Sequence, residues 1–124
     1  SDIDYRQLKS LDGLAQKPSL DHNFCISHFS GKLKPLALLQ SRLSGISMQL
    51  FSAEAGLQVY DAAYMNVSAQ EGLHGRPYVA YSALALEPQG WPNAANESAF
   101  PGVVLHPTDS YSQHTRFIFD TDAQ

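Results

Sequence analysis

Apolar and polar residues alternate along several short segments of this chain, and this alternation constrains the fold more than any other feature. Between Ile46 and Leu50, three apolar side chains alternate with Ser47 and Gln49. Because successive side chains of a β-strand point to opposite faces, a period of two predicts a strand with one buried face. The further candidate strands are 23–29, 36–42, 57–63, 79–87, 103–105 and 111–119. We therefore expect about six or seven short strands.

Glycine, proline, serine and asparagine cluster between these segments, as at 30–31 and 92–96. Short alternating segments separated by such residues are typical of antiparallel sheets. The prediction is an all-β fold, an antiparallel β-sandwich or part of one. The 124 residues suit one domain or one piece of a domain.

One segment, 5–17, has a spacing that suits a helix. Its apolar residues recur every three positions, at Tyr5, Leu8, Leu11 and Leu14. Gly13 weakens this prediction, because glycine is unfavourable inside a helix. A loop is an equal alternative.

Composition and charge exclude several classes of function. The net charge is -4, and the 8 lysines and arginines are mostly scattered singly, so nucleic acid is not an expected partner. No apolar run is long enough to cross a bilayer, and neither a signal nor a transit peptide is visible. The chain starts at Ser1, which need not be a natural start. The single cysteine, Cys25, lies in an apolar run, which predicts a buried, unreactive thiol and agrees with a cytoplasmic location.

Glu87 is the most informative single residue. It ends the candidate strand 79–87, where it would share one face with small and aromatic residues, namely Val79, Tyr81, Ala83 and Ala85. A carboxylate in line with alanines leaves space above the sheet for a small ligand. Pro88 has no N–H to donate, so the strand is expected to stop there. The alternative is an ordinary surface glutamate at a strand end, which the pattern alone favours.

Asp21 and Gln58 are further candidates for binding a polar ligand. For Asp21 the alternative is a turn former at the start of a strand, and for Gln58 it is a polar residue on a solvated sheet face. The five histidines show no His-x-x-x-His spacing, and one cysteine cannot form a Cys-x-x-Cys pair. We therefore expect no metal site. A glycine-rich phosphate loop and a Gly-x-Ser-x-Gly motif are also absent from the sequence.

From residue 21 onward, six motifs follow one another in a fixed order. They are Asp21-His22-Asn23-Phe24, Glu54-Ala55-Gly56-Leu57-Gln58-Val59-Tyr60, Leu86-Glu87-Pro88-Gln89, Trp91-Pro92, Phe100-Pro101 and Leu105-His106-Pro107-Thr108-Asp109-Ser110-Tyr111. In order and spacing this set resembles the C-terminal half of the aldose 1-epimerase (galactose mutarotase) family. The resemblance covers nearly the whole chain after residue 20.

The resemblance implies an isomerase of hexose metabolism that interconverts the α and β anomers of free aldohexoses without a cofactor. It implies that Glu87 is the catalytic base and that Asp21 and Gln58 bind the sugar, which would be glucose- or galactose-like. Residues 1–124 would form the C-terminal portion of a galactose-mutarotase-like supersandwich. The N-terminal half of that domain, with the general-acid histidine, would be absent from this chain and would be its partner.

The chain departs from the family pattern in places. The family has Thr-Gly-Asn where this chain has Asp61-Ala62-Ala63, and residues 1–19 match poorly. Two other functions remain as alternatives. The first is a non-catalytic carbohydrate-binding module that uses Asp21, Gln58 and aromatic side chains. The second, ranked lower, is a glycoside hydrolase with Asp21 and Glu87 as paired carboxylates.

Overall fold

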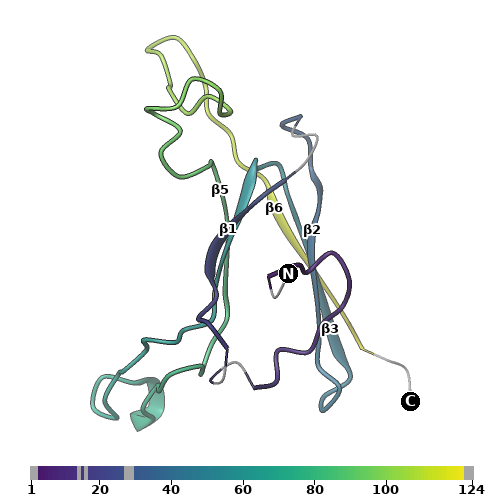
Figure 1. Cartoon of the computed structure of the whole chain (residues 1–124), viewed down its shortest axis with the longest axis vertical. Coiled ribbons are helices and arrows are strands. Elements are labelled where there is room, and N and C mark those ends of the chain that lie inside the picture. Colours follow the sequence, from purple (N-terminus) through teal and green to yellow (C-terminus); the bar gives the residue numbers. More distant parts are fainter. Residues whose placement is uncertain (1–2, 14, 16, 27–29, 122–124) are drawn as a thin grey trace. The chain divides into compact units, whose positions relative to one another are not determined.

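A computed structural model describes residues 3–13, 15, 17–26 and 30–121 of the chain (Figure 1). Within these residues the named elements are β1 Asp21–Cys25, β2 Lys34–Gln40, β3 Ile46–Ser52, β4 Gly56–Tyr60, the short 3₁₀ helix η2 Leu73–Gly75, β5 Ala85–Gln89 and β6 Thr115–Thr121. None of the described residues forms a helix long and apolar enough to cross a membrane.

The strands form two three-stranded antiparallel sheets. One has the order β1-β4-β5 and the other the order β2-β3-β6. In the first sheet, the amide of Asp61 donates to the carbonyl of Leu20 at 2.9 Å, and the amide of Ile26 donates to the carbonyl of Ala55 at 2.9 Å. In the second, Leu50 of β3 lies opposite Ala37 on one side and Phe117 on the other. The predicted all-β, antiparallel fold is confirmed.

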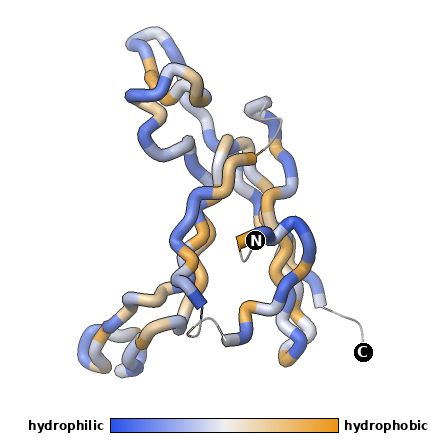
Figure 2. Tube along the Cα trace, in the orientation of Figure 1, coloured by the Kyte–Doolittle hydropathy of each residue, from blue (hydrophilic) through white to orange (hydrophobic). Residues whose placement is uncertain are grey.

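The described residues group into two compact units. The first contains residues of 1–22 and 58–87, and the second contains residues of 23–57 and 88–124. Strands β1, β4 and β5 each run from one unit into the other, whereas β2, β3 and β6 belong to the second. Hydrophobic residues concentrate along the strands (Figure 2).

The core of the second unit follows from the alternation in β3. Leu50 is 0% exposed, and Ala55 and Leu57 are also buried. Ser52, two residues after Leu50 and so on the same face of β3, is buried too. The period of two therefore selected the face that is buried at Leu50, although Ile46 on the same face is 45% exposed.

Strand β6 presents apolar side chains to solvent. All seven of its residues are exposed, including Phe117, Ile118 and Phe119. Among the described strands, β6 pairs with β3 alone, so it forms an edge of its sheet. An exposed apolar edge strand is normally covered by another part of the same protein or by a partner.

Most predicted strands form, with shifted ends. Segments 46–50, 36–42, 57–63 and 111–119 correspond to β3, β2, β4 and β6, and 23–29 corresponds to β1, although residues 27–29 lie outside the described part. Segment 103–105 forms no strand. In 5–17 the described residues form turns, bends and irregular structure, with one 3₁₀ residue at Ala15 and no α-helix; Leu14 and Gln16 lie outside them.

The prediction of a strand over the whole of 79–87 is wrong. Residues 79–82 form a turn, closed by the amide of Ser82 donating to the carbonyl of Val79 at 3.0 Å. Tyr81 has φ 63°, a left-handed conformation that ends any strand. Val79, Tyr81 and Ala83 therefore do not share a strand face with Glu87.

Two further expectations near these strands are also wrong. Pro88 does not end the strand, because β5 continues to Gln89. Strand β5 is at an edge of its sheet, where a proline without an N–H is tolerated. Cys25 is exposed rather than buried. It is two residues beyond Asn23, so it points to the polar face of β1 despite its apolar neighbours.

Candidate functional site

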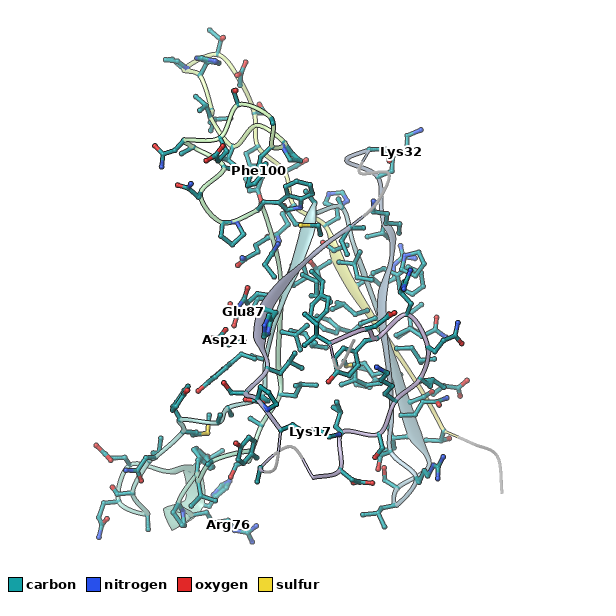
Figure 3. All side chains as sticks on the ribbon, in the orientation of Figure 1. Lys17, Asp21, Lys32, Arg76, Glu87 and Phe100 are labelled. Atoms are coloured by element: carbon teal, nitrogen blue, oxygen red, sulfur yellow. The ribbon has the colours of Figure 1, made fainter. Side chains whose placement is uncertain are left out.

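The three residues singled out in the sequence lie on three adjacent strands of one sheet. Asp21 begins β1, Gln58 is the middle residue of β4, and Glu87 is the middle residue of β5. All three belong to the first compact unit. Figure 3 shows Asp21 and Glu87 at the same level of this sheet. The folded chain thus brings together residues that lie far apart in the sequence.

Asp21 and Gln58 are joined directly. The side-chain amide Nε2 of Gln58 donates to Oδ1 of Asp21 at 2.6 Å. Asp21 is exposed and Gln58 is half-buried, so the pair is held together at the surface of the sheet. An exposed carboxylate beside a fixed amide offers both hydrogen-bond acceptors and donors to a hydroxyl-rich ligand.

Glu87 is exposed and lies on the same face as this pair. In β5, Glu87 and Gln89 are two residues apart, and in β1, Asp21 and Asn23 are two residues apart, so each pair shares a face. Nε2 of Gln89 donates to Oδ1 of Asn23 at 3.5 Å, which places these two faces on the same side of the sheet. Sequence reasoning missed Asn23 and Gln89. Their period-two spacing from Asp21 and Glu87 is the signal that identifies them.

Gly56 makes this contact possible. It lies in β4, the strand between β1 and β5, and it has no side chain to fill the space. A Cβ at position 56 would lie 2.6 Å from Oδ1 of Asn23 and 3.1 Å from Cδ1 of Trp91. The absence of a side chain at this position therefore lets the amides of Asn23 and Gln89 approach each other over β4.

Replacing Gly56 with alanine is expected to destabilise the protein by about 1–3 kcal/mol, because the added methyl group must displace Asn23 and the Trp91 ring. Gly102→Ala is the matched control, since a Cβ there has no atom within 4 Å and should change the stability by less than about 0.5 kcal/mol. Urea unfolding of both variants measures the difference. Equal stabilities for the two variants would contradict the proposed role of Gly56.

Trp91 anchors the segment that follows β5. Its indole Nε1 donates to the carbonyl of Ala55 at 2.6 Å. Its ring meets that of Phe100 edge to face, with centroids 5.0 Å apart. The Trp-Pro and Phe-Pro motifs thus meet in the structure. The two aromatic rings pack against each other, and the Trp91 indole is hydrogen-bonded to the β3–β4 turn, which identifies a structural role for both motifs.

Glu54 is a buried carboxylate in the second unit. It is 9% exposed, and its Oε1 accepts a hydrogen bond from the hydroxyl of Tyr111 at 2.6 Å. Its backbone amide donates to the hydroxyl of Ser52 at 3.2 Å. The hydrogen bond to Glu54, with a smaller contribution from burial, raises the pKa of the Tyr111 hydroxyl above its ordinary value. Tyr111 thus ties the segment before β6 to the β3–β4 turn.

Replacing Tyr111 with phenylalanine is expected to destabilise the protein by about 1 kcal/mol at pH 7, a low value because the Tyr111 ring is largely exposed. The pKa of the Tyr111 hydroxyl is raised in the folded state, so the hydroxyl's contribution to the free energy of unfolding depends on pH. The contribution is complete below the ordinary pKa of 10.0 and is lost as pH rises through the folded-state pKa. Urea unfolding of wild type and variant at pH 7 and above pH 10 should therefore show a difference that shrinks at the higher pH. A difference independent of pH would contradict this assignment.

Comparison with known proteins identifies the family of this chain. The sequence model of the aldose 1-epimerase family matches residues 3–117. The chain belongs to the aldose 1-epimerase family, as the ordered motifs predicted.

Individual relatives agree with this assignment. Galactose mutarotases from Sus scrofa and Homo sapiens are 33% and 32% identical to the chain over 99 and 104 residues, and an aldose 1-epimerase from Haemophilus influenzae is 30% identical over 101 residues. Each match covers 80% of this chain and 28% of the relative, so the chain spans little more than a quarter of their length. The crystal structure of a GalM/aldose epimerase homologue from C. elegans superposes with a TM-score of 0.73 at 28% identity, covering 83% of this chain and 30% of that one.

Proposed function

We propose that this chain is the C-terminal portion of a mutarotase-like β-sandwich domain and that the domain interconverts the α and β anomers of free aldohexoses. The observation that carries the proposal is the arrangement of Asp21, Gln58 and Glu87 on one face of one sheet, in a chain of this family. Relatives named galactose mutarotase and aldose 1-epimerase support a glucose- or galactose-like sugar as the substrate.

In the proposed reaction Glu87 acts as the base. Its carboxylate takes the proton from the C1 hydroxyl while an acid protonates the ring oxygen, and the ring opens. Rotation about the C1–C2 bond and closure on the other face give the second anomer, with the proton transfers reversed. Opening breaks the bond between C1 and the ring oxygen as the C1 carbonyl forms, and closure re-forms it, so the steps involve no net oxidation or reduction and need no cofactor. The acid, a histidine in our proposal, comes from the part of the domain outside this chain.

Asp21 and Gln58 are proposed to bind sugar hydroxyls. The carboxylate of Asp21 accepts from Gln58, and this hydrogen bond holds both side chains in one orientation before the sugar arrives. Such a pair suits recognition of a ligand rich in hydroxyl groups.

The remainder of the domain is the proposed partner of the exposed apolar edge at β6. Phe117, Ile118 and Phe119 are exposed, and the family relatives are much longer than this chain. Covering this edge would remove apolar surface from water and pair the free side of the strand. A reducing cytoplasm, the location we propose, agrees with the single free cysteine, Cys25.

Polarimetry tests the proposed function. Freshly dissolved α-D-glucose and α-D-galactose are followed with the 124-residue chain and with the full-length protein that contains it. Faster relaxation than in buffer supports a mutarotase. Release of reducing sugar from glycosides would instead indicate a hydrolase, and saturable sugar binding without either activity would indicate a carbohydrate-binding module. Either of these last two results would overturn the proposal.

A further inference from the structure

Asp61 is a fully buried carboxylate close to the proposed sugar-binding pair. Its side chain is 0% exposed. Oδ2 accepts a hydrogen bond from the backbone amide of Leu20 at 2.7 Å, and Oδ1 accepts from the amide of Ala63 at 3.0 Å. The backbone amide of Asp61 also donates to the carbonyl of Leu20 at 2.9 Å. Both oxygens of a buried carboxylate are therefore used to hold backbone amides.

These contacts join the two strands that carry the pair. Leu20 immediately precedes Asp21 at the start of β1, and Asp61 immediately follows the end of β4, which contains Gln58. The backbone amide and the backbone carbonyl of Leu20 are both hydrogen-bonded to Asp61. The register of β1 against β4 is thereby fixed beside the hydrogen bond between Asp21 and Gln58, and all four residues lie in the same compact unit.

A buried carboxylate is costly unless its oxygens are hydrogen-bonded, and hydrogen bonds to a charged acceptor are strong and strict in geometry. An apolar residue at this position would leave the amide of Leu20 without its buried acceptor. The side chain is therefore suited to holding a short strand in one position.

We propose that Asp61 is a positioning residue of the sugar site. By holding the Leu20 amide it keeps Asp21 in register with Gln58, so the two side chains are hydrogen-bonded before the sugar binds. This inference rests on the proposed sugar-binding role of Asp21 and Gln58. It assigns to Asp61 no contact with the sugar and no proton transfer.

The first measurement is kinetic and uses the full-length protein. Asp61→Asn keeps the size of the side chain but replaces one carboxylate oxygen with an NH₂ group, which cannot accept a hydrogen bond. One of the two backbone amides, that of Leu20 or that of Ala63, therefore loses its acceptor. We expect the KM for galactose or glucose in the polarimetric assay to rise about tenfold, with kcat changed by less than about threefold. Glu71→Gln is the matched control, because Glu71 also accepts from a backbone amide, that of Ser68, but lies outside the strands of the site. Its KM should stay at the wild-type value.

The second measurement does not depend on activity. The chemical shifts of the Gln58 side-chain NH₂ group report its hydrogen bond to Asp21. The shifts of the same group in an Asp21→Asn variant show how they change when this hydrogen bond is disturbed. We expect Asp61→Asn to shift these signals toward those of the Asp21→Asn variant. Asp61→Thr, whose single hydroxyl can accept from one amide, should give a smaller shift and replaces Asp61→Asn if that variant does not fold.

The outcomes separate the two proposals. A folded Asp61 variant with unchanged Gln58 signals overturns the positioning role, whether or not the protein is an enzyme. A variant with unchanged KM and only a smaller folded fraction also overturns it. Shifted Gln58 signals in a protein without mutarotase activity support the positioning role and contradict the proposed function alone.

Discussion

Replacing Glu87, the proposed base, with glutamine is expected to lower the rate constant for mutarotation by about 100- to 10,000-fold, the usual contribution of a positioned general base. Glutamine has nearly the same shape as glutamate but cannot take the proton from the C1 hydroxyl. Glu87 is exposed, so the change should leave the stability within about 0.5 kcal/mol of wild type. Polarimetric relaxation of α-D-galactose and α-D-glucose with the full-length protein measures the effect.

Two comparisons sharpen this prediction. Glu97→Gln makes the same chemical change at an exposed glutamate in a loop and should leave the rate unchanged. The KM of the Glu87 variant should change much less than its kcat, because the proposed sugar-binding residues Asp21 and Gln58 are intact. Full activity in a correctly folded Glu87→Gln protein would remove Glu87 from the role of base, even though the chain belongs to the family.

Replacing Leu50 with alanine is expected to destabilise the protein by about 2–5 kcal/mol. Leu50 is fully buried on β3, opposite Ala37 of β2 and Phe117 of β6. Removal of its side chain leaves a cavity at the centre of this sheet. The loss is large compared with a total stability of about 5–15 kcal/mol for a typical domain. Urea unfolding followed by circular dichroism measures it.

Leu43 provides the matched control for Leu50. It lies in the turn between β2 and β3 and is fully exposed, so Leu43→Ala should change the stability by less than about 0.5 kcal/mol. The two variants make the same chemical change and differ in burial alone. If Leu50→Ala costs less than about 1 kcal/mol, the core of this unit lies elsewhere.

The family and the strands of this chain could be predicted because both depend on local patterns. Alternation at Ile46–Leu50 predicts a strand because the period of two is a property of the extended backbone itself. The ordered motifs from Asp21 to Tyr111 indicated the family because their order and spacing agree with the family pattern. The family match over residues 3–117 agrees with this prediction. The same motifs named Glu87, Asp21 and Gln58 as candidate site residues.

The failures of prediction occur where a few backbone angles decide the outcome. Segment 79–84 has β-forming residues, yet Tyr81 adopts a left-handed conformation and the chain turns. Pro88 reads as the end of a strand, but an edge strand does not need its N–H. In both cases the sequence pattern is compatible with two backbone paths, and the local residues do not choose between them.

The buried carboxylates mark the limit of sequence reasoning most clearly. Glu54 and Asp61 are acidic residues that a sequence places on the surface, yet both are buried. Each is buried because a partner distant in the chain, Tyr111 for Glu54 and Leu20 for Asp61, supplies the hydrogen bond that offsets the cost of leaving water. Strand identity and family thus follow from local spacing alone. The partners of Glu54, Asp61 and Gln58 depend on which distant segments meet, and that is established when the chain folds.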